Sequence, residues 1–377
     1  MKTLAIIIVI AIAYFDPINF LGLRPMLLAV SAIFYPFIVF RYLTHLNTHI
    51  FTIFFILYLP LYGILNYVIR GGQFTSFEDT SYLSTSLVIA IVLYLSRDNI
   101  SLSIKFTRII SSIFAFLIFI VAAELLLARS SVIVDVLLAN EIGRISFRSY
   151  GGIDFPYVYL YSSPLLLLPL GIILNRFYSK KMTIAIILES LLYIVAIFLS
   201  GTRSHMFLAF LASIILVSRI YRFSFLPLLV LSGLLISNFS LEIITGMLSL
   251  NEGSNSFKTS MVPVYLDMLM NVDSFVFGQG FNAHSWSLDL QKIIHVSQGA
   301  TKSELTYIEF FRIFGVVNAI FFFSWVLIRL CDRRSWFFLP LIFILFDAIL
   351  NPHLFSTYGA VILGMSLLKR KHYGVII

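Results

Sequence analysis

After a long polar segment, the chain returns to apolar residues through Ser303-Glu304-Leu305-Thr306-Tyr307-Ile308-Glu309-Phe310-Phe311-Arg312-Ile313-Phe314-Gly315. This stretch still carries charged side chains where it enters an apolar run that continues to about residue 328. Ionisable side chains are costly inside a membrane, and those that occur there usually have a function. The preceding polar segment, residues 240–302, interrupts a chain that is otherwise mostly apolar. We therefore expect a membrane protein whose working face lies where this segment meets its exit helix.

The composition also predicts a polytopic membrane protein. The 377 residues are 60% hydrophobic and only 12% charged, and the mean hydropathy is +0.98. A soluble domain carries about 25% charged residues. The apolar runs are too long and continuous for outer-membrane strands, and helices satisfy their own backbone groups in lipid. The single cysteine, Cys331, excludes a disulfide within the chain and any multi-cysteine metal site.

Apolar runs near the length of a membrane crossing predict about twelve transmembrane helices in one integral-membrane domain, residues 1–377. The expected spans are approximately 3–20, 25–41, 50–69, 82–96, 107–127, 156–175, 182–200, 204–219, 223–239, 303–328, 335–350 and 356–368. Placing both termini in the cytoplasm puts sixteen of the 26 basic residues in or beside short cytoplasmic turns, as the positive-inside rule requires. The net charge of +8 thus reflects topology, not nucleic-acid binding. Two long segments then lie outside, 128–155 and 240–302.

Ten basic residues depart from the cytoplasmic bias, and three of them, Arg144, Arg148 and Arg203, lie at the outer face in or next to loops. A guanidinium group presents a planar fork of donors that suits phosphate, and it stays charged when desolvated. Together these side chains would form an anion site. The alternative is that they reach lipid phosphates or pair with loop carboxylates such as Asp135 and Asp154.

Glu304 and Arg312 are eight residues apart on one expected helix, about 80° apart around it and about 12 Å apart along its axis. Both side chains can therefore face one cavity. The alternative for Arg312 is a buried structural ion pair, for example with Glu309.

Several other titratable residues are weaker candidates. His284 follows a glycine-rich turn, and His205 and His353 lie at expected outer helix ends; histidine titrates near neutrality and can carry protons. Glu189 and Asp347 would lie within spans, either as proton relays or as hydrogen-bonded groups between helices. The sequence has no Walker or dinucleotide glycine motif and no residues at metal-ligand spacing. We expect no metal and no cofactor.

Four segments resemble the O-antigen polymerase/ligase superfamily of bacterial inner membranes. They are the arginine-bearing loop at 144–152 before a central span, the Ser-Gly-Thr-Arg-Ser turn at 200–204, the Phe-Gly-Gln-Gly-Phe segment at 277–281, and Glu304 followed after Leu305 and nine further residues by Gly315. Glu304 stands where the ligases of this superfamily have a histidine, which favours polymerases of the Wzy type.

The resemblance implies a GT-C-like glycosyltransferase that polymerises undecaprenyl-pyrophosphate-linked repeat units at the periplasmic face of the inner membrane. It implies that Arg203 stabilises the pyrophosphate leaving group, with Arg144 or Arg148 assisting. Glu304 or His284 would activate the acceptor hydroxyl. Arg312, His205 and Tyr307 complete the candidate pyrophosphate or substrate contacts. A chain-length regulator and a flippase are candidate partners, and the product is O-antigen or a related surface polysaccharide.

Three alternatives remain open at this point. A structural membrane scaffold would explain the topology but not the outer-face arginines. An O-antigen ligase would share the superfamily and the outer-face arginines. A lipid-linked oligosaccharide flippase or other transporter would share the number of spans, but transporters of this size usually have repeated halves and lack a large outer segment late in the chain.

Overall fold

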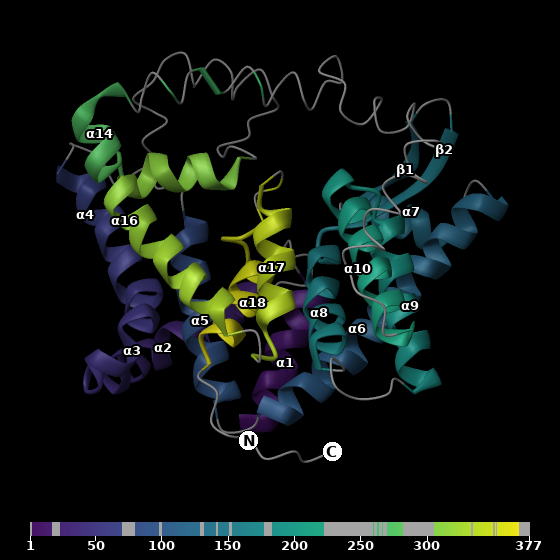
Figure 1. Cartoon of the computed structure of the whole chain (residues 1–377), viewed down its shortest axis with the longest axis horizontal. Coiled ribbons are helices and arrows are strands. Elements are labelled where there is room, and N and C mark those ends of the chain that lie inside the picture. The colour runs from purple at the N-terminus through teal and green to yellow at the C-terminus, as the bar shows by residue number, and fades with distance from the viewer. Residues whose placement is uncertain are drawn as a thin grey trace. The chain divides into compact units, whose positions relative to one another are not determined.

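The computed structural model describes residues 2–16, 23–69, 80–97, 100–128, 132–140, 142–150, 153–176, 183–221, 259, 262–263, 266, 270–281, 305–332, 335–349, 351 and 353–368. The described chain is mostly helical and divides into two compact units. The first unit comprises Met1–Pro25, Asn99–Asn255 and Trp336–Asp347, and the second comprises Met26–Asp98, Ser256–Ser335 and Ala348–Ile377. Figure 1 labels the elements of both units.

The first unit is a helical bundle with one β-hairpin. Its elements are α1 (Lys2–Phe15), α6 (Ile100–Ala128), α7 (Val132–Ala139), β1 (Gly143–Tyr150), β2 (Ile153–Leu160), the 3₁₀ turn η3 (Ser163–Leu166), α8 (Leu167–Arg176), α9 (Ile184–Leu199), α10 (Arg203–Tyr221) and α17 (Phe338–Asp347).

Helix α8 forms the core of this unit, because it packs against α6, α9, α10 and α17. Leu168, Leu170 and Leu174 are all 0% exposed, as expected for a helix that is apolar on every side and therefore buried on every side. Gly171 permits a close approach to α17, since a Cβ atom there would lie 2.5 Å from the backbone nitrogen of Pro340.

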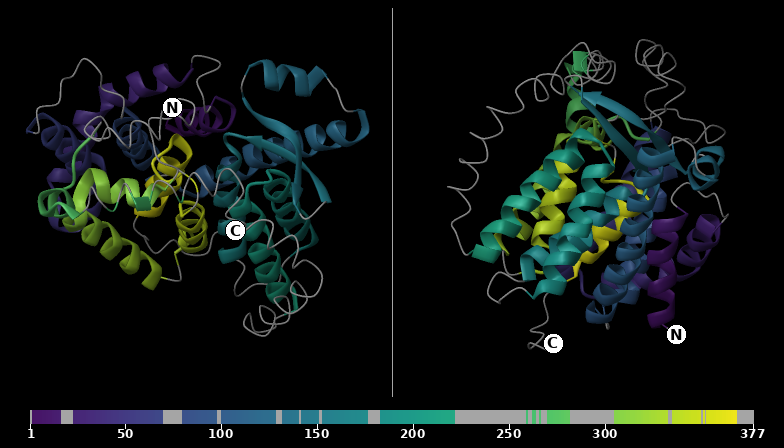
Figure 2. Two further views of the ribbon diagram at one scale, coloured as in Figure 1. Left: turned by 90° about the horizontal axis from the view of Figure 1, so that it is seen from above. Right: turned by 90° about the vertical axis from the view of Figure 1, so that its right-hand side faces the viewer.

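The hairpin is the main departure from the expected all-helical fold. Residues 128–155 were expected to be a loop and 156–175 a spanning helix, whereas the structure forms α7, then β1 paired antiparallel with β2 as far as Leu160. The pairing of Tyr150 with Ile153 leaves two residues, Gly151 and Gly152, for the connection. Alternating aromatic and β-branched residues such as Tyr157 and Val158 favour a strand over a helix. Figures 1 and 2 show the hairpin at one end of α9 and α10.

The second unit is also mostly helical. Its elements are α2 (Leu23–Leu43), α3 (Leu46–Ile53), the π-helical turn η1 (Phe54–Tyr58), α4 (Leu59–Ile69), α5 (Thr80–Ser96), α14 (Val272–Phe277), α16 (Thr306–Cys331) and α18 (Thr357–Leu367). The segments α3, η1 and α4 follow one another without a break. The wider π turn frees backbone carbonyls, and those of Phe55 and Ile56 accept hydrogen bonds from Ser86 and Tyr35.

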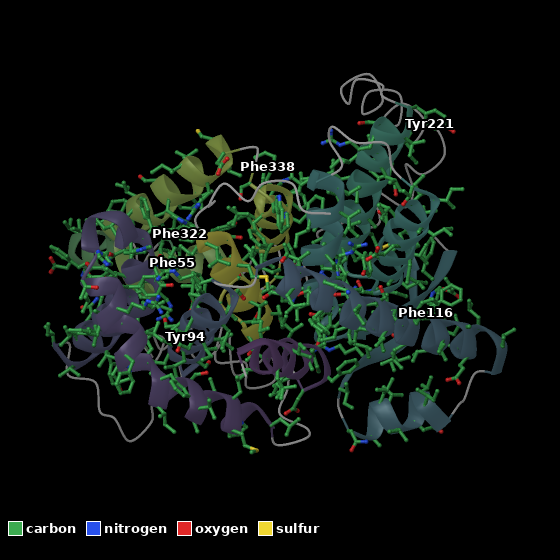
Figure 3. The ribbon with its side chains drawn as sticks, turned by 90° about the horizontal axis from the view of Figure 1, so that it is seen from below. Phe55, Tyr94, Phe116, Tyr221, Phe322 and Phe338 are labelled. Atoms are coloured by element: carbon green, nitrogen blue, oxygen red, sulfur yellow. The ribbon has the colours of Figure 1, made fainter. Side chains whose placement is uncertain are left out.

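The core of the second unit combines a buried helix with an aromatic cluster. Helix α18 is buried along its whole length and packs on α5. Phe55 lies with its ring centroid 5.9 Å from that of Phe322 and 4.8 Å from that of Trp325. Figure 3 labels Phe55 and Phe322, and it also labels Phe116 of the first unit, which is 56% exposed on α6. Exposed aromatic side chains of this kind suit a lipid-facing surface.

Five described helices are long and apolar enough to cross a membrane: Pro25–Leu43, His49–Ile69, Ile100–Leu127, Arg203–Tyr221 and Thr306–Cys331. The other apolar helices are shorter, at 10–17 residues. The 14 residues of α1 cover about 21 Å at 1.5 Å per residue, less than the roughly 30 Å of a bilayer core. The expected span 223–239 and most of the expected external segment 240–302 lie outside the described residues.

Candidate functional site

The turn between α9 and α10 is defined here as the Arg203 turn, residues 200–204. Helix α9 ends at Leu199, and Gly201 takes a φ of +64°, which reverses the chain. Thr202 caps the next helix, because its Oγ1 accepts a hydrogen bond from the backbone N–H of His205 at 3.2 Å. Arg203 is therefore the first residue of α10, at the end of the helix where the backbone dipole is positive.

The β-hairpin brings Arg148 against the Arg203 turn. In the register of β1 and β2, Arg148 lies opposite Phe155, and Arg144 lies opposite Tyr159 on the same face. The Nη1 of Arg148 donates to the carbonyl oxygen of Gly201 at 3.3 Å. Its guanidinium carbon lies 4.8 Å from the ring centroid of Tyr157, a cation–π contact. Of the two candidate hairpin arginines, Arg148 is the one that contacts the turn, while Arg144 is exposed.

Gly201 is required by this packing as well as by its φ. A Cβ atom at residue 201 would lie 2.4 Å from Cδ2 of Tyr157. The backbone of the turn thus touches the same ring that carries the Arg148 guanidinium. Two arginines, Arg148 and the half-buried Arg203, consequently belong to one small region at the N-terminus of α10. A region of this kind suits an anion such as phosphate.

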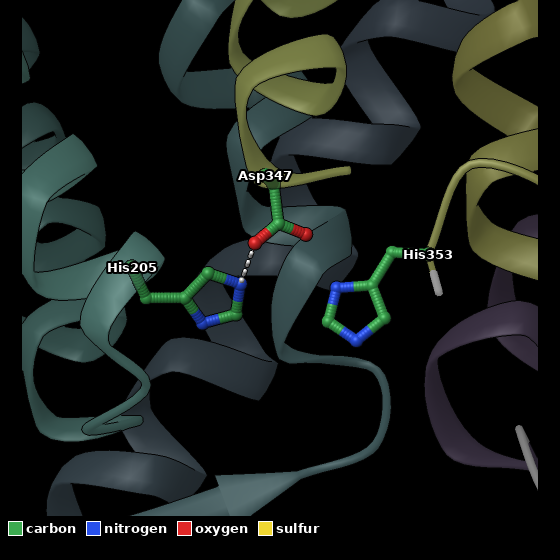
Figure 4. Close-up of side chains that lie close together, drawn as sticks. All are labelled: His205, Asp347 and His353. Carbon is green, nitrogen blue, oxygen red and sulfur yellow. Dashed lines mark ion pairs between the residues drawn. The ribbon is translucent and has the colours of Figure 1, made fainter. Parts of the chain in front are cut away.

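A buried polar cluster lies directly behind the Arg203 turn. The Nδ1 of His205 is 2.6 Å from Oγ of Ser200, and its Nε2 is 3.4 Å from Oδ1 of Asp347, the last residue of α17. Ser204 donates to the same Asp347 oxygen at 2.7 Å. Figure 4 shows the His205 ring turned toward Asp347. His205 is 0% exposed, so its position favours a supporting role over direct contact with substrate.

The second unit contains the Phe-Gly-Gln-Gly-Phe segment, which is docked into a break in α16. Gly315 has non-helical angles, φ 74° and ψ 174°, and Figure 1 shows the helix bending along its length. The backbone N–H groups of Gln279 and Gly280 donate to the carbonyl oxygens of Arg312 and Ile313 at 2.7 and 3.0 Å. Residues 277–281, the Gly278 segment, therefore replace the helical hydrogen bonds that the break removes.

The Gly278 segment is also fixed to α4. The side-chain amide of Asn66 donates to the carbonyl oxygens of Phe277 and Gly278, both at 3.0 Å. The backbone N–H of Phe281 donates to the carbonyl oxygen of Gly63 at 3.3 Å. The sequence motif at 277–281 thus joins two helices through its backbone, a structural use of its glycines.

Arg312 forms a buried ion pair with Glu309, which was the alternative to a substrate contact that the sequence suggested. Its Nε donates to Oε2 of Glu309 at 2.9 Å, its Nη2 contacts the second carboxylate oxygen, and the two side chains are 0% and 4% exposed. Tyr307 lies in the first turn of the same helix, with its ring centroid 5.9 Å from that of Phe323. Glu304 and His284, the candidate acceptor-activating groups, lie outside the described residues.

Glu189 is hydrogen-bonded between helices. It forms a two-point ion pair with Arg108 of α6, with Nε 2.9 Å from Oε1, and it accepts a hydrogen bond from the Tyr193 hydroxyl at 2.9 Å. Arg108 was expected at the cytoplasmic edge of its span from charge counting alone. The long-range pairing of α6 with α9 has no local sequence signal.

His205 and Asp347 of the first unit lie close together and are of residue types that bind metal ions. His205 offers a ring nitrogen and Asp347 a carboxylate oxygen, one ligand fewer than the three protein ligands of catalytic zinc sites. His353 belongs to the second unit. The contact of Asp347 with the Arg203 turn is the feature of the candidate site that the sequence did not predict, because 143 residues separate Asp347 from Ser204.

Comparisons of the chain with family models, with curated proteins and with solved structures found no match. The geometry of the Arg203 turn and the four segments that carry the resemblance are therefore the basis for a functional assignment.

Proposed function

We propose that this chain is an integral-membrane glycosyltransferase that polymerises lipid-linked oligosaccharide repeat units into O-antigen or a related surface polysaccharide. The donor is the growing glycan on undecaprenyl pyrophosphate, and the acceptor is the non-reducing end of a new lipid-linked repeat unit. The enzyme would reside in the bacterial inner membrane as a multi-pass protein, with both termini in the cytoplasm and its active site facing the periplasm.

One observation carries the proposal: the contact of Arg148 with the turn from which Arg203 begins α10. The hydrogen bond to Gly201 and the contact with Tyr157 orient the Arg148 guanidinium beside the helix N-terminus. Arg203 is half-buried, which leaves part of its side chain open to a ligand. Two guanidinium groups and a positive helix end are the components that stabilise a departing pyrophosphate.

The chemistry assigned to these residues is a glycosyl transfer. The bond between the donor sugar and pyrophosphate breaks, and a bond forms between that sugar and the acceptor hydroxyl oxygen. The acceptor proton passes to a base, for which Glu304 and His284 are the candidates. Undecaprenyl pyrophosphate leaves with its developing negative charge against Arg203 and Arg148. Arg312 and Tyr307 of the second unit remain candidate contacts for the glycan.

The test is an Arg203→Ala variant in a strain that lacks the chromosomal gene. Removing one preorganised donor to a developing charge typically costs about 100- to 1000-fold in rate. We therefore expect the polysaccharide ladder on a gel to collapse to the core carrying a single repeat, while protein abundance in the membrane stays unchanged.

Arg219→Ala is the matched control, because Arg219 lies in the last turn of the same helix α10. It should leave the ladder intact. A normal ladder from Arg203→Ala would refute the proposal. Loss of all substituted core in the deletion strain would instead identify a ligase or a flippase.

A further inference from the structure

The buried cluster behind the Arg203 turn joins both flanks of the turn to a third helix. Ser200 precedes the turn's glycine and Ser204 follows Arg203, and both are at most 2% exposed. Ser204 donates directly to Asp347 at 2.7 Å. Ser200 is 2.6 Å from His205, whose other ring nitrogen faces the same Asp347 oxygen at 3.4 Å. The two flanks therefore converge on one carboxylate oxygen, and Figure 4 shows the His205 side of this arrangement.

The direction of the hydrogen bonds follows from the donors present. The Ser200 hydroxyl lies 2.6 Å both from the carbonyl oxygen of Ile197 and from Nδ1 of His205. An ionised carboxylate only accepts, so Nε2, which faces Asp347, is the nitrogen that carries the proton of a neutral imidazole ring, and Nδ1 then accepts from Ser200. Asp347 thereby faces two donors, the Ser204 hydroxyl and the Nε2–H of His205. Polar groups in a dry interior are retained only where such bonds are made.

We propose that Asp347 is a positioning residue for the Arg203 turn, which it holds from both flanks, through Ser204 directly and through Ser200 by way of His205. The functional part of this inference rests on the proposed role of Arg203 toward pyrophosphate. An arginine stabilises a leaving group only when its guanidinium is held close to the required place, and a turn with a glycine at positive φ needs external support to stay there.

The variants that test this role should still fold, because α17 has other contacts in the first unit. Phe346 stacks on Phe207 of α10 with ring centroids 4.9 Å apart, and α17 also packs along α8. Asp347→Ala removes both contacts to the turn. Asp347→Asn keeps an oxygen that accepts from Ser204. Ser204→Ala removes only the direct contact.

The first measurement is amide hydrogen exchange at residues 201–206 of the purified full-length chain in detergent. Losing the carboxylate should raise the exchange rate about tenfold in Asp347→Ala, with a smaller rise in Ser204→Ala and the smallest in Asp347→Asn. The matched control is Tyr14→Phe, which removes a buried hydroxyl that donates to Leu165 elsewhere in the first unit. It should leave exchange at 201–206 unchanged. Wild-type exchange in Asp347→Ala would overturn the proposal.

The second measurement is the concentration of inorganic pyrophosphate that half-saturates a rise in melting temperature of the same proteins. We expect this concentration to increase about tenfold in Asp347→Ala and to recover largely in Asp347→Asn. If Asp347→Ala exchanges faster but binds pyrophosphate as the wild type does, the positioning role is refuted. If the wild type itself does not respond to pyrophosphate while the exchange result holds, Asp347 still supports the turn and the proposed function is what fails.

Discussion

Each unit contains a place where helical structure stops at a glycine with positive φ: the turn between α9 and α10 in the first unit, and the break inside α16 in the second. The two units stabilise these places by different means. At the Arg203 turn, Gly201 is surrounded by side chains: Arg148 on its carbonyl oxygen, Tyr157 on its Cα, and the cluster of Asp347 behind. At Gly315, the backbone of residues 276–278 takes the place of these side chains. A Cβ atom at residue 315 would meet Val276 O at 2.4 Å and Gly278 N at 2.5 Å.

This difference distinguishes a candidate binding site, at the Arg203 turn, from a structural junction, at Gly315. The broken helix at Gly315 is satisfied by backbone groups, because the N–H groups of the Gly278 segment bond to its carbonyl oxygens. Side chains at the Arg203 turn carry charge and are partly exposed at Arg148 and Arg203. Substitutions at the Gly315 break should therefore act on folding, and substitutions at the Arg203 turn should act on activity.

The largest expected effect comes from Gly315→Ala. Its angles lie in a region that is essentially restricted to glycine, and the added methyl group would collide with backbone that cannot rotate away. We expect a loss of about 3 kcal/mol or more in stability, enough to remove most folded protein. Size-exclusion chromatography of a fluorescent fusion in detergent measures the folded fraction.

Gly201→Ala is the comparison for Gly315→Ala. The Cβ atom at residue 201 meets the ring of Tyr157, a side chain that has some freedom to move. The cost in stability should therefore be smaller, about 1–2 kcal/mol, and most of the protein should remain folded. The proposed polymerising activity should fall, because the Tyr157 ring also contacts the Arg148 guanidinium. Equal losses of folded protein in the two variants would contradict the distinction between the candidate site at the Arg203 turn and the structural junction at Gly315.

An effect on folding as large as that of Gly315→Ala is expected at Arg312. Removing one partner of a buried ion pair leaves an uncompensated charge and typically costs about 3–5 kcal/mol. Arg312→Met should therefore reduce folded protein, and Arg312→Met combined with Glu309→Leu should recover part of the loss. The folded fraction and the polysaccharide ladder are measured on the same strains. A folded double variant with an intact ladder assigns the pair to structure, whereas a folded double variant without a ladder assigns Arg312 to the glycan.

The sequence predicted where helices occur better than it predicted which elements contact one another. Apolar length predicted long helices in both units, the turn at 200–204 between two helices is confirmed, and the number of twelve spans stays a prediction. The hairpin was missed, although Gly151-Gly152 between alternating aromatic and β-branched residues is a recognisable hairpin signal. It was missed because the apolar run after Pro156 reads equally well as a span, and hydropathy does not distinguish a buried strand from a helix.

The polar contacts of the candidate site depend on distant pairing. Arg148 reaches Gly201 across 53 residues, and Ser204 reaches Asp347 across 143. Such contacts follow from how α10, α17 and the hairpin pack, and no local spacing encodes them. The Arg312–Glu309 pair is different, since two residues three apart on a helix are neighbours, and the sequence alone suggested it.

The smallest expected effect comes from Arg148→Lys, which keeps the charge on the hairpin. A lysine loses the planar group that lies over Tyr157 and the Nη1 hydrogen bond to Gly201, so about 1 kcal/mol of stability should be lost. The proposed polymerising activity should fall about tenfold, which a shortened but visible ladder would report. Arg144→Lys is the matched variant, at an exposed position on the same face of β1. If Arg144→Lys shortens the ladder more than Arg148→Lys, the contact with the Arg203 turn is not what matters, and the hairpin would serve the substrate through its exposed arginine instead.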